Sequence, residues 1–250
     1  MLQRTQPIQH IIFDCDSTLT TLEGIDELAA LVDKKEHISE LTRKAMDGEV
    51  PLEGVFFERI DLIKPTYTQM VQVGRQYTRS LSNNAKMIFE IARYFGKSLY
   101  IFSAGYLASL EVLGDYLGLP RENVRAVDII FDQQGDYLYC PRDQLLTWTD
   151  GKLRLVRHMN FPYNNTMMIG DGANDLSVQE GVDLFVGYQG EKENRFMREN
   201  ARIFLQGDDL LPVISMMLTV EEKEQLAKTH YAQMVKQSEA MVKERVVVKK

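Results

Sequence analysis

The feature that most limits how this chain can fold is a short apolar run, residues 8–13, that stops at Asp-Cys-Asp-Ser-Thr, residues 14–18. The run reads as a strand, and the serine and threonine indicate that it ends in a turn carrying both aspartates. A carboxylate at a strand's end can hold a divalent cation or attack phosphorus as a nucleophile. Taken alone, the segment fits a solvated turn equally well, because Asp and Ser favour turns.

Three later segments extend this pattern along the chain. Residues 98–102 form a strand-like run that leads into Ser-Ala-Gly, and residues 166–169 lead into Gly-Asp-Gly-Ala-Asn-Asp. Between them, Lys152 opens an amphipathic stretch, residues 153–159, that reads as a helix. Short apolar runs separated by helical patterns are typical of strands buried on both faces of a parallel sheet. The sequence therefore predicts an α/β fold, a Rossmann-like doubly wound parallel sheet whose strand ends line one crevice.

The four segments resemble, in order, the four motifs of the haloacid dehalogenase superfamily of phosphohydrolases, and the resemblance covers nearly the whole chain. The family pattern is D-x-D-x-T, then Ser or Thr at a second strand end, then Lys, then a paired-acid loop. The matching positions are Asp14, Asp16, Thr18, Ser103, Lys152, Asp171 and Asp175. The resemblance implies a Mg²⁺-dependent phosphomonoester hydrolase that works through an aspartyl-phosphate intermediate.

The chemistry of phosphoryl transfer explains why the family needs these residue types. A phosphate monoester dianion repels a carboxylate, so Asp14 can act as the nucleophile only where a cation such as Mg²⁺ neutralises the phosphate oxygens. The resemblance implies that Asp14, Asp171 and the backbone carbonyl of Asp16 bind the metal. It also implies that the Asp16 side chain protonates the leaving oxygen and later activates water. Asp175 is expected to orient a neighbouring lysine or the metal shell rather than to touch the substrate.

The other motif residues are expected to hold the phosphoryl group. Lys152, also counted with the catalytic residues, and the Ser103 hydroxyl would clamp the phosphate oxygens. The backbone N–H groups around Ala104 and Gly105 would assist them. Asn174 would reach the phosphoryl group or its attacking water. These residues complete the predicted binding site for a small phosphomonoester.

Length, composition and net charge indicate which classes of protein and which partners the chain can have. With 250 residues, of which 44% are hydrophobic, the chain can bury one large core and a small accessory domain. The net charge of −7 argues against a nucleic-acid partner. No apolar run approaches the roughly 18 residues of a membrane span, and Cys15 and Cys140 alone make a disulfide framework unexpected. We expect a cytoplasmic enzyme with no membrane partner; an oligomeric state is not predicted.

The spacing of the motifs predicts the domain organisation. The catalytic core comprises residues 1–19 and 81–219, and a helical cap, residues 20–80, is inserted after the first strand. Within the core, residues 127–149 read as a β-hairpin flap, because two short strand-like stretches flank the turn Asp-Gln-Gln-Gly-Asp. The tail, residues 220–250, is charged and helical in pattern with a basic end, and we expect a solvated helix.

Two charged residues of the cap admit both a structural and a functional interpretation. Arg59 lies inside the apolar stripe of its helix, where a guanidinium needs an anion, although the side chain can also extend outward or pair with a structural carboxylate. Glu23 fits a capping box that starts at Thr20. From the local pattern alone, the structural interpretation is favoured for both residues.

Residues 14–29 and 45–59 resemble the phosphoserine phosphatase branch of the superfamily, which changes this interpretation. The resemblance implies that Glu23 binds the substrate ammonium and Arg59 its carboxylate. Ala104 departs from the branch's usual Ser-Gly-Gly. The leading hypothesis is a phosphoserine phosphatase that releases L-serine and phosphate. The alternatives are a related capped phosphatase for a nucleotide or a phosphorylated amino alcohol, a phosphotransferase to an alcohol, and a noncatalytic metabolite sensor.

Overall fold

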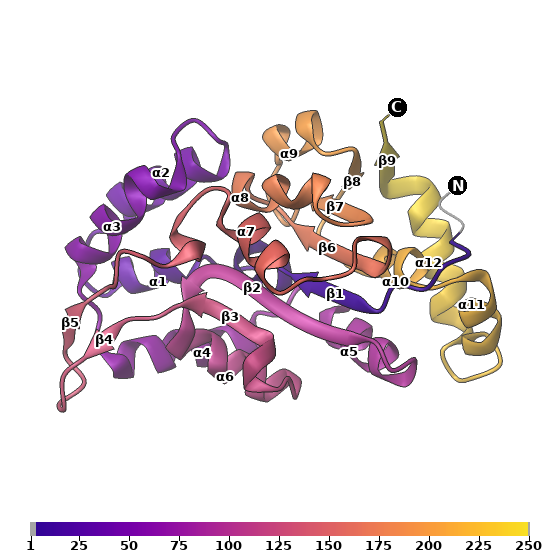
Figure 1. Cartoon of the computed structure of the whole chain (residues 1–250), viewed down its shortest axis with the longest axis horizontal. Coiled ribbons are helices and arrows are strands. Elements are labelled where there is room, and N and C mark those ends of the chain that lie inside the picture. The colour runs from indigo at the N-terminus through magenta and orange to yellow at the C-terminus, as the bar shows by residue number, and fades with distance from the viewer. Residues whose placement is uncertain (1–3, 250) are drawn as a thin grey trace.

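The computed structural model of this protein describes residues 4–249, and its centre is a seven-stranded sheet (Figure 1). The strands are β1 His10–Phe13, β2 Ser98–Tyr106, β3 Val124–Val127, β6 Thr166–Gly170, β7 Leu184–Tyr188, β8 Ile203–Leu205 and β9 Val246–Val248. Their spatial order is β3-β2-β1-β6-β7-β8-β9. All neighbours are parallel except β9, which is antiparallel to β8. Strands β2 and β3 lie on one side of β1, and the later strands β6 to β9 lie on its other side. The predicted doubly wound sheet is therefore confirmed.

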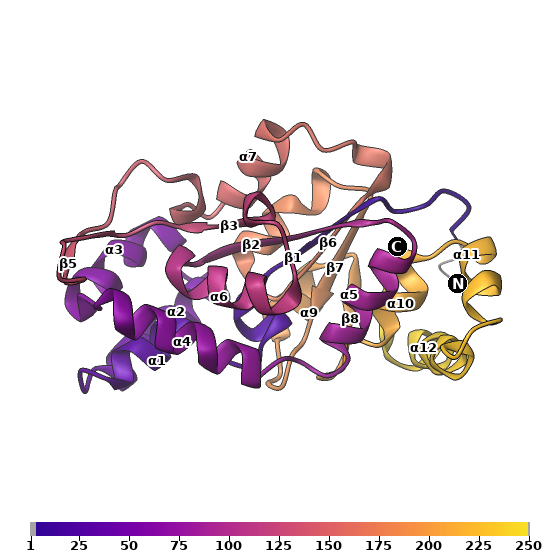
Figure 2. The same ribbon diagram turned by 90° about the horizontal axis from the view of Figure 1, so that it is seen from below.

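Helices cover both faces of this sheet. Helix α7, Gly151–His158, lies on one face, and α5, Ala85–Tyr94, and α6, Leu107–Leu117, lie on the other (Figure 2). This arrangement follows from right-handed crossovers that run in opposite directions from β1. Two short helices, α8 Ala173–Leu176 and α9 Arg195–Asn200, follow β6 and β7. Among residues 4–249, no helix combines the length and the apolar character that crossing a membrane requires.

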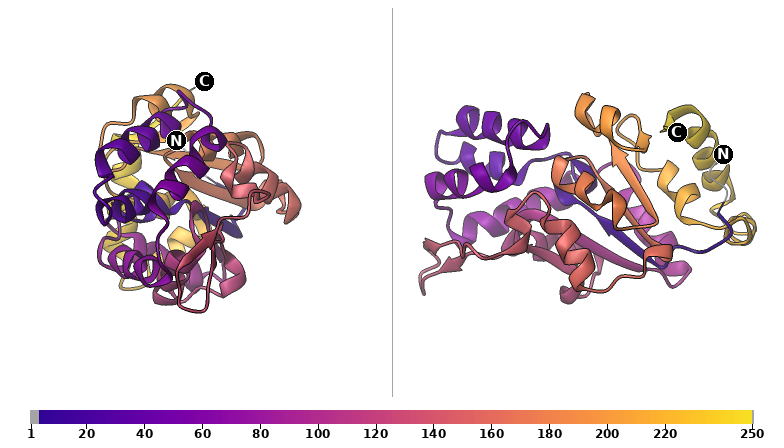
Figure 3. Two further views of the ribbon diagram at one scale, coloured as in Figure 1. Left: turned by 90° about the vertical axis from the view of Figure 1, so that its left-hand side faces the viewer. Right: turned by 45° about the horizontal axis from the view of Figure 1, so that its top comes forward.

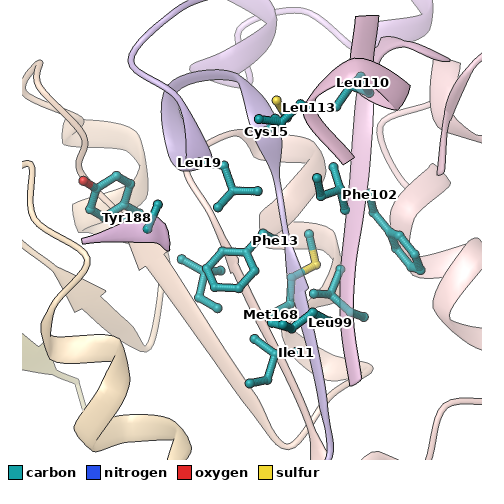
Figure 4. Close-up of a cluster of buried hydrophobic side chains, with 14 of the residues drawn as sticks. Ile11, Phe13, Cys15, Leu19, Leu99, Phe102, Leu110, Leu113, Met168 and Tyr188 are labelled. Carbon is teal, nitrogen blue, oxygen red and sulfur yellow. The ribbon is translucent and has the colours of Figure 1, made fainter. Parts of the chain in front are cut away.

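The apolar runs that predicted the strands form the core of the sheet. Ile11 and Phe13 are fully buried and pack with Met168 and Leu99 of the neighbouring strands (Figure 4). Strand β1 pairs in parallel with β2 on one side and β6 on the other. Because β1 ends at Phe13, Asp14 follows at the carboxyl edge of the sheet, between the ends of its two neighbours. That edge is where open α/β sheets bind their ligands.

Four helices between β1 and β2 extend beyond the carboxyl ends of the strands (Figure 3). They are α1 Gly24–Ala30, α2 Lys35–Met46, α3 Leu52–Ile63 and α4 Tyr67–Arg79. The chain leaves the core and returns to it side by side, because Thr20 and Leu81 form an antiparallel bridge. This narrow neck supports our proposal that the cap comprises residues 20–80.

The last cap helix, α4, is also docked on the core. The hydroxyl of Ser109 in α6 donates a hydrogen bond of 2.7 Å to the carbonyl of Met70 in α4. Gly74 permits this close approach, since a Cβ at that position would lie 2.5 Å from the Ser109 carbonyl oxygen. Helix α4 is therefore held on the core by close packing and a buried hydrogen bond.

The predicted hairpin flap is present and rests on the cap. Strands β4, Ile130–Phe131, and β5, Tyr137–Tyr139, pair antiparallel. The Tyr137 hydroxyl donates a 2.8 Å hydrogen bond to Asp61 of α3, and Arg142 forms a 3.0 Å ion pair with the same carboxylate. A hydrogen bond and an ion pair therefore hold the flap against α3.

The prediction of a solvated tail helix is wrong. After α10, Pro212–Met217, the chain forms α11, Val220–Leu226, and α12, Ala232–Arg245, and residues 246–248 join the sheet as β9. Helix α12 packs against α10, and the buried Ser238 hydroxyl donates a 2.8 Å hydrogen bond to the Leu211 carbonyl. The tail is therefore an integral part of the core.

Candidate active site

A pocket lies where the carboxyl ends of β1, β2 and β6 meet the cap. Its lining includes all of the predicted site residues except Lys152: Asp14, Asp16, Glu23, Arg59, Ser103, Ala104, Gly105, Asp171, Asn174 and Asp175. Lys152 is fully buried and hydrogen-bonded to Asp14. The structure thus gathers into one place residues that the sequence spreads over five segments.

The turn after β1 directs both aspartates of the first motif into this pocket. Ser17 adopts a left-handed backbone conformation with φ 54°, which reverses the chain directly after Asp16. Thr18 is buried, and its hydroxyl donates a 2.7 Å hydrogen bond to Asp171 at the end of β6. The first and last motifs are therefore tied together by a direct side-chain contact.

Lys152 joins two carboxylates at the base of the pocket. Its ammonium contacts Asp14 and lies 2.5 Å from Asp175. Asp175 also accepts a 2.9 Å hydrogen bond from the Gly172 N–H, which fixes its orientation. Burial alone would lower the pKa of Lys152, but the two carboxylates outweigh burial and raise the pKa above its ordinary value. The lysine therefore stays charged and holds Asp14 in place.

Asp14, Asp171 and Asp175 form a buried cluster in which one oxygen from each carboxylate lies within 4.8 Å of the others. Burial, followed by the charge of Asp175, raises the pKa of Asp171 to about 8. The same two causes raise the pKa of Asp14 well above its ordinary value, although Lys152 opposes them. The Lys152 ammonium contacts only Asp14 and Asp175, so the three acidic groups outnumber the one cation among them, and hard oxygen donors of this kind suit a divalent cation.

Asp16 lines the pocket and accepts hydrogen bonds from two residues of the cap. Its Oδ1 accepts a 2.5 Å hydrogen bond from the Tyr77 hydroxyl and a 2.7 Å hydrogen bond from the Gly24 N–H. Its Oδ2 lies 3.5 Å from the Ser103 hydroxyl. Burial raises the pKa of Asp16 from its ordinary value, although the two donors act in the other direction. A carboxyl group with a raised pKa suits proton transfer.

The Ser-Ala-Gly segment, residues 103–105, belongs to the last part of β2 and lines the pocket, so this strand runs further than the sequence predicted. The Ser103 hydroxyl is buried and accepts a 2.8 Å hydrogen bond from the Gly105 N–H. This leaves the hydroxyl proton free to be donated into the pocket. A Cβ at Gly105 would lie 2.9 Å from Asp16 Oδ2 and 3.0 Å from the Ser103 hydroxyl, so any larger residue there would displace these two side chains. Ala104 lines the pocket at half-burial, and its methyl group is accommodated.

Glu23 faces the pocket and does not form the predicted capping box. The Thr20 hydroxyl lies 3.3 Å from the Cys15 carbonyl instead of capping α1. Glu23 accepts a 2.5 Å hydrogen bond from the Ser17 hydroxyl. Burial raises the pKa of Glu23 well above its ordinary value, and the charges of Asp16 and Asp171 add to this effect. The side chains of Thr20 and Glu23 both form hydrogen bonds with residues of the turn after β1, so they do not cap α1. The structural interpretation of Glu23 is therefore wrong.

Arg59 is buried in the pocket wall and lacks a counter-ion in the described residues. Its side chain is 6% exposed, and one guanidinium nitrogen donates a 2.9 Å hydrogen bond to the Thr42 hydroxyl. Its Nε has no hydrogen-bond partner among residues 4–249, and no carboxylate of these residues lies within ion-pair distance. The side chain neither extends outward nor pairs with a structural carboxylate. A buried guanidinium in this state calls for an anion in the pocket.

A family model described as haloacid dehalogenase-like hydrolase matches residues 8–178 of this chain. The match covers more than half of the 250 residues and contains every segment that lines the pocket. The chain belongs to the haloacid dehalogenase-like hydrolases.

Several relatives of this hydrolase are phosphoserine phosphatases. It is 30% identical over 205 residues to the chloroplastic phosphoserine phosphatase of Arabidopsis thaliana, covering 80% of this chain and 70% of the relative. It is 32% identical over 188 residues to the phosphoserine phosphatase of Drosophila melanogaster, covering 74% and 70%. A solved phosphoserine phosphohydrolase-like protein from Francisella tularensis has a TM-score of 0.76 at 21% identity, covering 84% of this chain and 100% of that one. This structural likeness supports the hydrolase fold.

Two threonines of this hydrolase that shape the pocket were not predicted from the sequence. Thr42 accepts the hydrogen bond from Arg59, and Thr149 accepts a 2.9 Å hydrogen bond from the Leu52 N–H at the start of α3. Thr42 had a visible signal, because it is a polar residue in the apolar stripe of its helix, which also buries Ile38. Thr149 had none, since its contact depends on how the cap docks on the core.

Tyr77 was also missed, although it donates a hydrogen bond to Asp16. It shares the buried face of α4 with Met70 and Val73, so the pattern indicates an ordinary core position. Its hydroxyl reaches Asp16 of this hydrolase only because α4 is docked on α6.

Proposed function

We propose that this hydrolase is a Mg²⁺-dependent phosphoserine phosphatase that forms an aspartyl phosphate on Asp14 and releases L-serine and phosphate. The observation that carries the proposal is the set of charged side chains that line one pocket. It holds the carboxylate of Asp14 at its base and, on the cap side, the carboxylate of Glu23 and the guanidinium of Arg59. A phosphorylated amino acid carries a phosphate, an ammonium and a carboxylate, which these groups complement in charge. The phosphoserine phosphatases among the curated relatives support the same substrate.

At the phosphate end, Asp14 would supply the nucleophile. Asp14, Asp171 and the backbone carbonyl of Asp16 would hold Mg²⁺, which when bound supplies positive charge to the phosphate oxygens. Lys152 keeps the Asp14 carboxylate fixed through its contact and adds positive charge at the base of the pocket. The Ser103 hydroxyl, which already accepts the Gly105 N–H, would donate its proton to a phosphate oxygen. These contacts orient the phosphorus toward Asp14.

Asp16 would move the proton in both halves of the reaction. In the first half, a carboxylate oxygen of Asp14 bonds to phosphorus, the bond from phosphorus to the serine oxygen breaks, and Asp16 gives its proton to that oxygen. In the second half, Asp16 takes a proton from water as the water oxygen bonds to phosphorus. The bond to Asp14 then breaks, and phosphate is released with Asp14 regenerated. The raised pKa of Asp16 supports this role.

At the amino-acid end, the cap would select the substrate. Arg59 would receive the serine carboxylate, and the hydrogen bond from its guanidinium to Thr42 fixes its direction. Glu23 would receive the ammonium, held by the hydrogen bond from Ser17. A phosphomonoester without these groups leaves a buried charge unpaired, which disfavours its binding.

We further propose that the enzyme works in the cytoplasm. Cys15 and Cys140 are both free thiols, and both are buried. Free cysteines without a disulfide partner are the usual state in a reducing compartment.

A panel of phosphomonoesters tests the proposed function. Phosphate release would be measured with phosphoserine, phosphoethanolamine and a nucleoside monophosphate, with Mg²⁺ and after chelation. We expect phosphoserine to have the highest kcat/KM, chelation to abolish release, and added Mg²⁺ to restore it. Preference for the nucleotide would contradict the assignment of phosphoserine as the substrate. Full activity after verified metal removal would contradict the proposed requirement for Mg²⁺. Product analysis with an added alcohol separates hydrolysis from phosphoryl transfer, since only a phosphotransferase forms a new phosphoester.

A further inference from the structure

The two oxygens of the Asp16 carboxyl group have different surroundings. Oδ1 accepts two hydrogen bonds, 2.5 Å from the Tyr77 hydroxyl and 2.7 Å from the Gly24 N–H. Oδ2 faces the Ser103 hydroxyl at 3.5 Å, beyond the usual length of an O–H···O hydrogen bond. Only Oδ2 therefore retains free hydrogen-bonding capacity toward the pocket.

The donor on Oδ1 that belongs to a side chain is held rigidly. Tyr77 is 1% exposed, and it does not line the pocket. It lies on α4, which is docked on the core through the hydrogen bond from Ser109 to Met70. A side chain at Gly24 would overlap the Tyr77 hydroxyl, so the glycine clears the path from the tyrosine to Asp16. The tyrosine is thus positioned by the core side of the cap and cannot reach a substrate itself.

We infer that Tyr77 is a positioning residue for the proton transfer made by Asp16. By donating to Oδ1 it fixes the rotation of the carboxyl group and leaves Oδ2 as the oxygen that exchanges a proton with the substrate. This inference deepens the proposed function and rests on its assignment of Asp16 as the proton donor. The geometry requires no contact between Tyr77 and the phosphoester.

The proton passes along a defined route in this arrangement. When the bond from phosphorus to the serine oxygen breaks, the proton leaves Oδ2 of Asp16 and bonds to that oxygen. When water attacks the aspartyl phosphate, the water proton returns to Oδ2. Tyr77 keeps its own proton in both steps and donates it to Oδ1 throughout. Loss of the tyrosine hydroxyl should therefore slow only those steps in which Asp16 must deliver or collect a proton.

Tyr77→Phe tests the inference by its dependence on the leaving group. Phosphoserine needs protonation of its leaving oxygen, whereas p-nitrophenyl phosphate releases a stable anion. We expect the single-turnover phosphorylation rate with phosphoserine to fall about 10-fold, the scale of one lost hydrogen bond to a charged group, with KM unchanged. For p-nitrophenyl phosphate, the single-turnover phosphorylation rate should change less than about twofold. Equal losses for the two esters would overturn the inference.

Combination with Asp16→Asn provides a second, independent test. If Tyr77 acts through Asp16, Tyr77→Phe should cause no further loss in the Asp16→Asn background. The same 10-fold loss in both backgrounds would show that the tyrosine acts elsewhere and would overturn the inference. Tyr100→Phe is the matched control, since it removes a tyrosine hydroxyl that lies 3.3 Å from His10, outside the pocket. Thermal unfolding of each variant verifies that it is folded.

Gly24→Ala covers the case in which the phenylalanine variant does not fold. The added methyl group would displace the Tyr77 hydroxyl while the tyrosine is kept. It should produce the same selective loss for phosphoserine, and an equal loss for both esters would count against the inference. If the wild type prefers another alkyl phosphomonoester, the phosphoserine assignment fails. The comparison of that ester with p-nitrophenyl phosphate then still decides the role of Tyr77.

Discussion

The charged groups at the base of the pocket and those on the cap differ in how completely they are paired. At the base, Lys152 contacts Asp14 and Asp175, and Asp171 accepts a hydrogen bond from Thr18. On the cap, Glu23 and Arg59 each have a single hydrogen-bond partner, a neutral hydroxyl group, and neither forms an ion pair in residues 4–249. The base is an interlocked network, whereas the cap presents charges that lack partners.

We propose that this difference reflects two roles: the base of the pocket carries out the chemistry, and the cap selects the substrate. A nucleophile must be held in one orientation whichever ester is bound, so its partners belong to the protein. A buried charged residue discriminates best between substrates when the correct substrate supplies its charged partner. A wrong ligand then leaves the buried charge unpaired. We therefore expect variants at the base to affect all phosphoesters and variants on the cap to affect only some of them.

The largest effect is expected for Asp14→Asn. An amide is a poor nucleophile, so kcat should fall at least about a thousandfold for every phosphomonoester. The melting temperature should not fall, because the substitution removes one negative charge from a cluster that has an excess of them. Asp150→Asn is the matched control, as this aspartate forms an exposed ion pair with Arg154 near the same lysine. A variant that retains a tenth of wild-type activity would contradict the role of Asp14 as nucleophile.

The cap variants should show selective effects. Arg59→Ala should reduce kcat/KM about 10- to 100-fold for phosphoserine and much less for phosphoethanolamine, which lacks the carboxylate. Glu23→Gln should impair both substrates, since both carry the ammonium. Steady-state kinetics on the two esters measures the ratio. Equal losses of kcat/KM for the two esters with Arg59→Ala would show that the arginine does not bind the substrate carboxylate, and the phosphoserine assignment would then fail.

The crowded carboxylates should also make stability depend on pH in the metal-free protein. Asp171 has a pKa of about 8 in the folded state, against 3.8 ordinarily. Between about pH 4 and pH 8 the folded state therefore keeps a proton that the unfolded state has lost, so stability should fall as the pH rises. The slope for one such proton is up to about 1.4 kcal/mol per pH unit.

Urea denaturation in the presence of a chelator measures this slope. Asp171→Asn should flatten the profile between pH 4 and pH 8, because the titrating carboxyl group is gone. Added Mg²⁺ should raise the stability of the wild type most at the upper end of this range. Parallel profiles for the wild type and the variant would show that Asp171 is not protonated in the folded state.

A smaller effect is expected in the tail, far from both sets of charges. The buried Ser238 hydroxyl accepts the Ser215 N–H at 2.9 Å and donates to the Leu211 carbonyl. Ser238→Ala should lower the free energy of unfolding by about 2 kcal/mol and leave kcat/KM unchanged. The exposed Gln237→Ala should change neither quantity. A stability loss as small as that of the control would show that α12 is not anchored through this serine.

The sheet and the base of the pocket were predictable because their signals are local in the sequence. Residues 11–13 and 167–169 are apolar, turn residues follow each run, and the motif residues lie in these turns. Strand β9 was not predictable, because three valines beside a charged helix form a strand only where β8 offers an open edge. That edge exists only when the rest of the sheet has formed, so the local sequence does not reveal it.

The cap residues were harder to predict because their contacts cross between helices. The capping-box pattern at Glu23 was present, yet the Glu23 carboxylate accepts a hydrogen bond from the Ser17 hydroxyl, and the Thr20 hydroxyl lies near the Cys15 carbonyl. Tyr77 has the spacing of a core residue, and only the docking of α4 on α6 directs its hydroxyl to Asp16. Side-chain directions of this kind are set by tertiary packing.

Trapping the covalent intermediate tests the central claim most directly. The enzyme would be mixed with phosphoserine and Mg²⁺, quenched in acid within the first turnover, digested, and sequenced by mass spectrometry. We predict a phosphoryl group on Asp14, formed before phosphate appears, and absent in Asp14→Asn. Phosphate released in the first turnover without any phosphorylated Asp14, or with the label on another residue, would contradict the account.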